Sequence, residues 1–373
     1  MIVLSNFVGC LLQHLAVRLG AGVSRDLAQA CREYYPRPVA RLLWVLAECA
    51  IAATDLAEVL GSAIALDILF GLPLLAGVLI TAADVLLLLL LNGQNARTCE
   101  ALVFCLMAII ATCLIFTLVQ AGAPVGQVMQ GLIPKRRILT NSNELYAAIG
   151  IMGATVMPHN LFLHSSLVQS RRFMKDAGGR WQAISYGTVD GTVSLFLAMF
   201  INAAILVVAA AAFYGKGPAV EDIHEAVSLL APALGSAAAS TLFAVGLLAA
   251  GQQSTLTGTL AGQIVLEGFM GTSVALKPWA RRLATRMVAI VPAVAVAASS
   301  GAEGVSKLLT LSQVVLSLAL PFCMFPLVHF TGSRAIMGDF VAPRPLRALC
   351  WLIFLCITAL NGKLLYDFST EDA

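Results

Sequence analysis

Long apolar runs alternate with short polar segments along almost the whole chain. Several runs reach the roughly 20 residues that an α-helix needs to cross a bilayer, and the shorter ones need tilt or flanking residues. The runs lie at 2–19, 42–70, 72–91, 101–120, 145–169, 186–213, 237–266, 284–298, 305–330 and 346–365. The pattern predicts an all-α, polytopic membrane protein with about ten transmembrane helices.

The composition supports this prediction. Hydrophobic residues make up 59% of the 373 residues, and charged residues only 12%. Soluble domains carry roughly 25% charged residues, so a soluble globular protein is excluded. The nine cysteines are scattered without a CxxC pair, as small buried apolar side chains would be. There is also no Gly-rich phosphate loop and no zinc-ligand spacing, so we expect no enzyme, no resident cofactor and no nucleic-acid partner.

Positive charge is divided unequally between the two alternating sets of loops. Seventeen of the 23 Lys and Arg residues fall in one set and six in the other. Because Lys and Arg mark the cytoplasmic side of a membrane protein, this asymmetry gives the chain an orientation in the bilayer. We expect a multi-pass protein of the cell membrane.

One apolar run contains an unusual group of side chains around Pro158. Proline has no N–H, and its ring clashes with the carbonyl four residues back, which here belongs to Ala154. Met157 adds a soft thioether, and His159 and His164 add titratable groups. A freed carbonyl is tolerated in a membrane only where it lines a cavity or is covered by protein. One interpretation is a proline kink with core histidines; the coincidence of these groups favours a cation site.

The thioether also indicates which cations such a site would prefer. Ca²⁺ and Mg²⁺ favour shells made only of oxygen, whereas a thioether suits softer ions. Met157 beside a carbonyl therefore disfavours Ca²⁺ and Mg²⁺ and admits Mn²⁺, Fe²⁺ and similar ions.

The run at 42–70 contains three acidic residues, Glu48, Asp55 and Glu58. At ~100° per residue, Asp55 lies about 20° and Glu58 about 80° from Glu48, so the three share one helix face. A carboxylate facing lipid costs roughly 2.5–3.5 kcal/mol at the helix centre, so this face must point inward. It forms either a proton path or cation-attracting wall, or a buried salt-bridge network with Arg281 and Arg282.

The run at 237–266 carries a polar band from Gln252 to Thr259, followed by Gln263. Gly258 and Gly262 form a GxxxG pair within it. Small residues allow close packing of transmembrane helices, and hydroxyls and amides bond across them. We interpret this band as a helix-packing surface.

Several of these segments resemble one known family. The segment from Met157 to Gln169 looks like the sixth-helix signature of the Nramp family of proton-coupled divalent metal transporters. Similar family segments are Arg25–Cys31, Thr54–Glu58, Gly258–Gln263 and Ser312–Ser317. The resemblance covers essentially the whole chain.

The resemblance implies a single transmembrane domain over 1–373 with an inverted-repeat, LeuT-like fold of five plus five helices. The first helix of each half is broken at the midplane in this fold. Residues 1–120 would form an incomplete first repeat, 143–331 the second repeat, and 346–365 an additional helix. The implied activity is uptake of Mn²⁺ or Fe²⁺ coupled to protons, so that metal ions, protons and the lipid bilayer are the partners.

The resemblance also implies roles for individual residues. It places Gln313 near the metal, which gives a ligand set of Ala154, Met157 and Gln313. It places Asp55 and Glu58 on the proton route, with basic residues of the ninth helix beside them. Arg281 and Arg282 align with those basic residues, and Arg286 is the competing alignment. The expected proton pathway consists of Asp55, Glu58, His159, His164, Glu48, Arg281 and Arg282.

One family feature has no counterpart in the sequence. The family's first helix carries an Asp-Pro-Gly-Asn motif that supplies two metal ligands, whereas Met1 aligns with the start of the second helix. No Asp-Pro-Gly occurs in this sequence. We therefore expect that the first helix is absent and that these residues do not form a competent transporter by themselves. A truncated gene product or an accessory subunit without transport is the resulting alternative.

A haem-binding membrane redox protein is a further alternative. It would need facing histidine pairs on neighbouring helices. His159 and His164 are about 140° apart around a helix, and no partner for either is evident in the sequence.

Overall fold

The structure is a computed structural model that describes residues 1–91, 96–133, 136–214, 223–271 and 278–371. All regular secondary structure in these ranges is helical. Seven helices within them are long and apolar enough to cross a membrane. The chain is therefore an all-α membrane protein, as the apolar runs predict.

The first third of the chain folds into helices, and the start of α2 and the end of α3 lie at residues typical of those positions. They are α1 (Ile2–Val23), α2 (Leu27–Tyr34), α3 (Arg37–Phe70), α4 (Leu74–Leu91) and α5 (Ala96–Ala121). The short α2 begins with a capping box, in which the Asp26 carboxylate accepts from the backbone N–H of Gln29 at 2.8 Å. This bond satisfies one of the free donors at the start of a helix. Gly71, with φ 65°, ends α3 in the left-handed conformation that favours glycine.

The rest of the described chain consists of long helices with short ones between them. The elements are α6 (Val125–Gln130), α7 (Arg137–Thr140), α8 (Ser142–Val156), α9 (Pro158–Ser170), α10 (Ala177–Phe213), α11 (Ile223–Leu234), α12 (Ala237–Met270), α13 (Pro278–Gly332), α14 (Arg334–Met337), η2 (Gly338–Phe340) and α15 (Arg344–Glu371). Each of the ten predicted runs corresponds to one or two of these helices, although the run at 72–91 begins two residues before α4.

The predicted runs at 284–298 and 305–330 both lie in α13. Their boundary is Gly301, whose φ of 59° and ψ of −147° are not helical. Glycine lacks a Cβ and adopts positive φ without steric cost. The two predicted helices therefore exist as two segments that meet at this kink.

The predicted run at 145–169 is divided by a break. Helix α8 ends at Val156, α9 begins at Pro158, and Met157 between them has φ 45° and ψ 98°. Positive φ is rare for a residue with a side chain. Pro158 occupies the first position of α9, where its missing N–H has no partner to lose. The break predicted from Pro158 is therefore confirmed.

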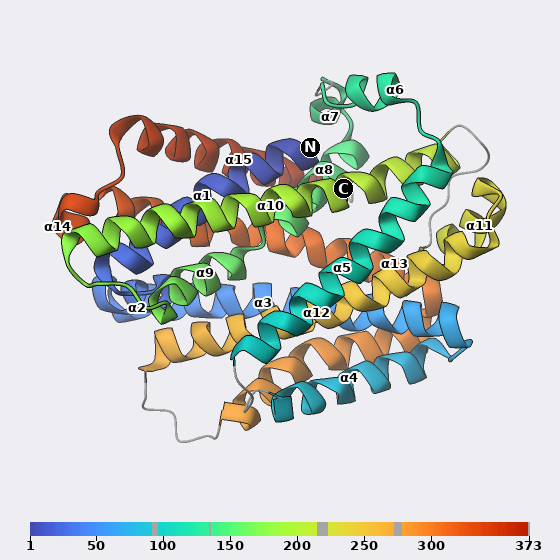
Figure 1. Cartoon of the computed structure of the whole chain (residues 1–373), viewed down its shortest axis with the longest axis horizontal. Coiled ribbons are helices and arrows are strands. Elements are labelled where there is room, and N and C mark those ends of the chain that lie inside the picture. The colour runs from blue at the N-terminus through green and yellow to red at the C-terminus, as the bar shows by residue number, and fades with distance from the viewer. Residues whose placement is uncertain (92–95, 134–135, 215–222, 272–277, 372–373) are drawn as a thin grey trace.

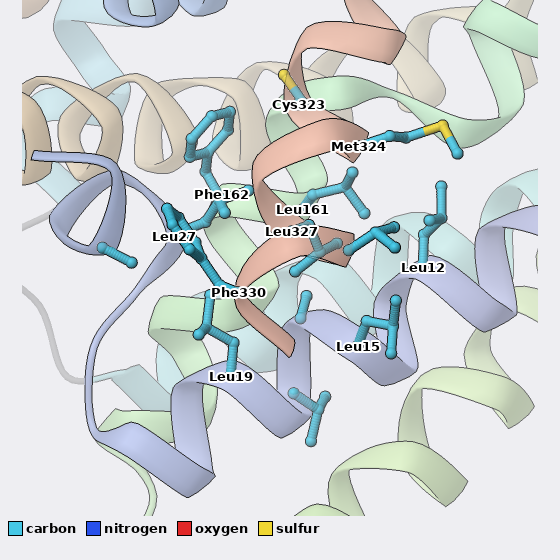
Figure 2. Packing of buried hydrophobic residues seen from close by; sticks show 14 of the residues in the cluster. Leu12, Leu15, Leu19, Leu27, Leu161, Phe162, Cys323, Met324, Leu327 and Phe330 are labelled. Atoms are coloured by element: carbon cyan, nitrogen blue, oxygen red, sulfur yellow. The ribbon is translucent and has the colours of Figure 1, made fainter. Parts of the chain in front are cut away.

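The largest buried apolar cluster joins α1, α2, α9 and the C-terminal part of α13. Figure 2 shows side chains of these helices meeting there, among them Leu12, Leu19, Phe162, Leu327 and Phe330. Lipid tails are as apolar as leucine, so close packing rather than exclusion of water stabilises such contacts. The cluster fixes α9, the second half of the broken helix, against the start of the chain.

Two further contacts position the elements of the site. Helix α3 packs along α12 and α13, and α8 packs against α13. Helix α15 lies beside α13 and also reaches α8 (Figure 1). The helix break and the acidic face of α3 are thus both held against α13.

Candidate functional site

The helix break presents backbone and sulfur groups at the junction of α8 and α9. Pro158 supplies no N–H to the carbonyl of Ala154. The backbone N–H of Met157 donates to Gly153 at 3.2 Å, and that of Asn160 donates to the Met157 carbonyl at 3.0 Å. The Asn160 amide donates to the Met157 thioether sulfur at 3.4 Å. Asn160 therefore orients the soft donor group at the break.

Gln313 of α13 lies beside this break because two glycines of α8 allow close approach. A Cβ on Gly153 would lie 2.2 Å from the backbone oxygen of Gln313 and 2.7 Å from the backbone nitrogen of Ser317. A Cβ on Gly150 would lie 3.9 Å from the Gln313 Cβ. The structure thus brings together the turn of α13 that carries Gln313 and the end of α8 that carries Ala154 and Met157.

The three ligands expected from the sequence are neutral: the Ala154 carbonyl, the Met157 thioether and the amide of Gln313, whose Nε2 donates to the Ser312 hydroxyl at 2.9 Å. Among the residues that the structure describes, no group of three or more His, Cys, Asp and Glu side chains could hold a metal ion. A permanently bound zinc or calcium ion would use such charged or imidazole ligands.

His159 connects the helix break to α3. Its Nδ1 lies 3.2 Å from the hydroxyl oxygen of Thr54, and the side chain is buried. Thr54 is the residue directly before Asp55. The break and the acidic face of α3 are therefore neighbours in the fold.

Asp55 and Glu58, which we call the acid pair, are both buried against α12. The Ser254 hydroxyl donates to Glu58 Oε1. A Cβ on Gly258 would lie 3.2 Å from Glu58 Oε1 and 3.4 Å from Asp55 Oδ1. Because Gly258 has no side chain, both carboxylates can approach α12 closely at this position.

Arg286 of α13 supplies the positive charge beside the acid pair. Its Nη1 lies 3.7 Å from Asp55 Oδ1, and both side chains are buried. Its Nη2 donates to the Thr255 hydroxyl at 3.4 Å. Breaking such a buried pair is strongly destabilising because it leaves one charge uncompensated. The pair is loose, since 3.7 Å is longer than a charge-assisted hydrogen bond.

Some atoms of this group have no hydrogen-bond partner among the described residues. They are Asp55 Oδ1, Glu58 Oε2, and Nε and Nη1 of Arg286. Buried polar atoms are normally paired, so unpaired ones require a specific explanation. A carboxylate oxygen with free lone pairs can accept a proton, and that is the chemistry which this arrangement permits.

The comparisons with known proteins agree with this geometry. The family model described as "Natural resistance-associated macrophage protein-like", Nramp, matches residues 1–367. The chain belongs to the Nramp family. The divalent metal cation transporter MntH of Nostoc sp. is 52% identical over 365 residues, which are 98% of this chain and 82% of that protein. The MntH of Xanthomonas campestris pv. campestris is 52% identical over 369 residues, with 99% and 83% covered.

Solved structures give the same result for the fold. The Eremococcus coleocola manganese transporter has a TM-score of 0.87 at 39% identity, with 96% of this chain and 78% of that chain covered. Mhp1, a nucleobase-cation-symport-1 family transporter, has a TM-score of 0.64 at 14% identity, with 98% and 82% covered. At that identity only the fold is shared. The inverted-repeat transporter fold expected from the sequence is therefore confirmed, while the proposed repeat boundaries stay a prediction.

Within this Nramp chain, Arg286 is the basic residue that the structure places beside Asp55. Arg281 and Arg282, the residues expected from the sequence, belong to the first turns of α13, but their side chains lie outside the described residues. Arg286 follows Arg282 by four residues, about one helical turn. Residues one turn apart lie on the same face of a helix. Which of them meets Asp55 therefore depends on how far α13 is shifted along α3, and a sequence does not fix that shift.

Two other residues expected in the proton pathway, Glu48 and His164, have other contacts than the acid pair and Arg286. Glu48 is half-buried, and its Oε1 accepts from the Trp44 indole at 3.0 Å. His164 lies against α10, since a Cβ on Gly191 would be 3.2 Å from its Nε2. His159 and His164 thus contact different helices.

The sequence analysis missed several polar partners in this Nramp chain. Ser254 and Thr255 contact the acid pair and Arg286, although we interpreted their polar band only as a packing surface. Thr54 and Asn160 are two further polar partners, of His159 and of Met157. Their positions gave a usable signal, because one precedes Asp55 and the other lies within the segment around Pro158.

Proposed function

We propose that this protein is a secondary transporter that moves divalent transition metal ions, Mn²⁺ or Fe²⁺, across the membrane together with protons. The observation that carries the proposal is the position of a broken helix with neutral metal donors next to a buried acid pair. Relatives named divalent metal cation transporters and a solved manganese transporter support the same substrate class. The metal is then the transported substrate rather than a resident cofactor, and no covalent chemistry is required.

The metal binds at the helix break in this proposal. The Ala154 carbonyl, the Met157 thioether and the Gln313 amide oxygen supply donors from two helices. The thioether disfavours Ca²⁺ and Mg²⁺ relative to softer ions because hard cations prefer oxygen. Binding at a break between two half-helices matches the way in which related transporter folds place their substrates.

Protons travel on a separate set of groups. Asp55 and Glu58 both carry an oxygen without a hydrogen-bond partner among the described residues, and each is a site that can take up a proton. Arg286 compensates the charge when Asp55 is ionised. His159 stands between the two sets through its contact with Thr54. A metal cation at the break repels nearby positive charge and so favours release of a proton from these groups. This repulsion couples metal binding to proton movement.

Reconstitution of the full-length protein in liposomes tests the proposal. A metal-sensitive dye and a pH dye inside the vesicles report the two fluxes. We expect Mn²⁺ entry to be accompanied by acidification, Cd²⁺ to compete strongly, and Ca²⁺ and Mg²⁺ to compete weakly. Absence of Mn²⁺ entry would overturn the transport proposal. Mn²⁺ entry without acidification would overturn the coupling alone.

A further inference from the structure

A buried polar contact joins α15 to α13 close to the helix break. The Asn361 amide Nδ2 donates to the backbone oxygen of Ser317 at 2.8 Å, and the Ser317 hydroxyl donates to Asn361 Oδ1 at 3.2 Å. Ser317 is fully buried, and Asn361 is 5% exposed. Both hydrogen-bonding groups of the amide are therefore used on a single residue of the neighbouring helix.

The sequence of α13 explains why this residue needs an outside donor. A helical carbonyl normally accepts from the N–H four residues later. For Ser317 that residue is Pro321, which lies inside α13 and has no N–H. A backbone oxygen left without a donor in the membrane interior is costly. Asn361 supplies the donor that Pro321 lacks, so α13 remains helical through this position.

The same turn of α13 forms one wall of the candidate metal site. The backbone oxygen of Gln313 and the backbone nitrogen of Ser317 are the atoms nearest to Gly153 of α8. Gln313 and Ser317 are four residues apart, so they lie on one face of α13. A displacement of Ser317 would therefore change the distance between Gln313 and the helix break.

We propose that Asn361 is a positioning residue for the metal site: it caps the Ser317 carbonyl and thereby holds the turn of α13 that carries Gln313. This inference rests on the proposed function for the identity of the ion. It gives α15, the helix beyond the two repeats, a defined role in the site. Asn361 does not touch the metal and acts only through α13.

A restoration experiment tests the inference. Asn361→Ala removes the donor, while Pro321→Ala returns an N–H to the Ser317 carbonyl from within α13. We expect Asn361→Ala to weaken Mn²⁺ binding roughly 3- to 10-fold, which is the usual size of a contact between coupled neighbours. The double variant with Pro321→Ala should recover to within about twofold of the parent. Titration calorimetry on the purified full-length protein measures both affinities.

Hydrogen exchange provides a second measurement that needs no metal. Asn361→Ala should speed amide exchange in the peptide that contains residues 313–320, and the double variant should restore it. Thr358→Ala is the matched control, because the Thr358 hydroxyl donates only to Phe354 of its own helix, at 2.7 Å. Ser317→Ala, which keeps the capped carbonyl, should have a smaller effect than Asn361→Ala.

The outcomes distinguish the capping of Ser317 by Asn361 from its effect on the metal site. A double variant no better than Asn361→Ala alone would overturn the capping role. Faster exchange in Asn361→Ala with unchanged Mn²⁺ affinity would show a purely structural contact and overturn the positioning role. Failure of the parent protein to bind or transport Mn²⁺ would instead count against the proposed function, while the exchange data would still decide whether Asn361 caps Ser317.

Discussion

Pro158 and Pro321 remove the same backbone donor from two neighbouring helices, and the chain responds to them in different ways. At Pro158 the helix opens, with Met157 at φ 45°, and no side chain described here caps Ala154. At Pro321 α13 continues, and Asn361 donates to the freed Ser317 carbonyl. The two positions therefore differ in whether a side chain of a neighbouring helix donates to the freed carbonyl. A proline alone does not open a helix, because α13 also continues through Pro292 and Pro326.

In the proposed mechanism the two freed carbonyls have different roles. The Ser317 carbonyl accepts a buried hydrogen bond from Asn361 and is structural. The Ala154 carbonyl, beside the Met157 thioether, is proposed to be a metal ligand. The two regions also touch, because the turn of α13 at 313–317 lies against Gly153. The capped turn of α13 therefore packs directly against the end of α8 at the helix break.

Gly153→Ala should have the largest effect, because it disrupts both regions at once. The new Cβ would lie 2.2 Å from the Gln313 backbone oxygen, so α8 and α13 must separate. Such overpacking costs about 1–3 kcal/mol, and sometimes more. We expect a lower melting temperature and loss of Mn²⁺ uptake. Gly150→Ala is the control, since its Cβ would meet Gln313 at an ordinary 3.9 Å; equal damage by both variants would refute the account of the contact.

Pro158→Ala should join α8 and α9 into one helix, as α13 is continuous through Pro321. The returned N–H can bond the Ala154 carbonyl, which removes it as a ligand. Loss of one donor should weaken Mn²⁺ binding by at least about tenfold, or ~1.4 kcal/mol. Calorimetry measures the affinity, and a crystal structure of the variant shows whether α8 and α9 have joined. Unchanged affinity in a joined helix would mean that the Ala154 carbonyl is not a ligand.

Much of this arrangement could be predicted from the sequence because its causes are local. The helix break follows from the missing N–H of Pro158, and the shared face of Asp55 and Glu58 follows from their spacing. The ten apolar runs predicted where the long helices lie. The Gly301 kink agrees with the division of α13 into two runs.

The parts that could not be predicted depend on how distant helices are rotated and shifted against one another. The meeting of Arg286 with Asp55 joins α13 to α3, and no local pattern sets that pairing. Ser254 resembled a packing residue because a hydroxyl that packs and one that binds a carboxylate look alike in a sequence. Asn361 gave no signal, since its partner is a carbonyl freed by a proline 40 positions earlier.

Glu58→Gln should show whether protons use a region separate from the helix break. The neutral amide keeps the shape but does not release a proton, so metal-driven acidification should fall on the order of tenfold, while Mn²⁺ binding changes by less than about twofold. Asp55→Asn should act in the same direction. Paired pH-dye and metal-dye measurements decide. Glu303→Gln, which alters an exposed carboxylate paired with Lys307, is the control, and full acidification with Glu58→Gln would exclude this residue from the pathway.

Met157→Ala should have the smallest effect on total binding, and it isolates the contribution of sulfur at the open region. The substitution removes the thioether, which accepts from the Asn160 amide at 3.4 Å, but leaves the Ala154 carbonyl in place. The remaining donors are all oxygen, and hard cations favour oxygen. Ca²⁺ should therefore compete a few-fold better against Mn²⁺ and Cd²⁺.

Competition assays with the reconstituted protein measure this change in selectivity. Cd²⁺ should lose more affinity than Mn²⁺, because it is the softer ion and gains more from sulfur. Met174→Ala is the matched control, since Met174 is exposed between α9 and α10. If Ca²⁺ inhibited the parent and Met157→Ala equally, the thioether would not set selectivity. The distinguishing feature of the break between α8 and α9 would then be the free carbonyl of Ala154.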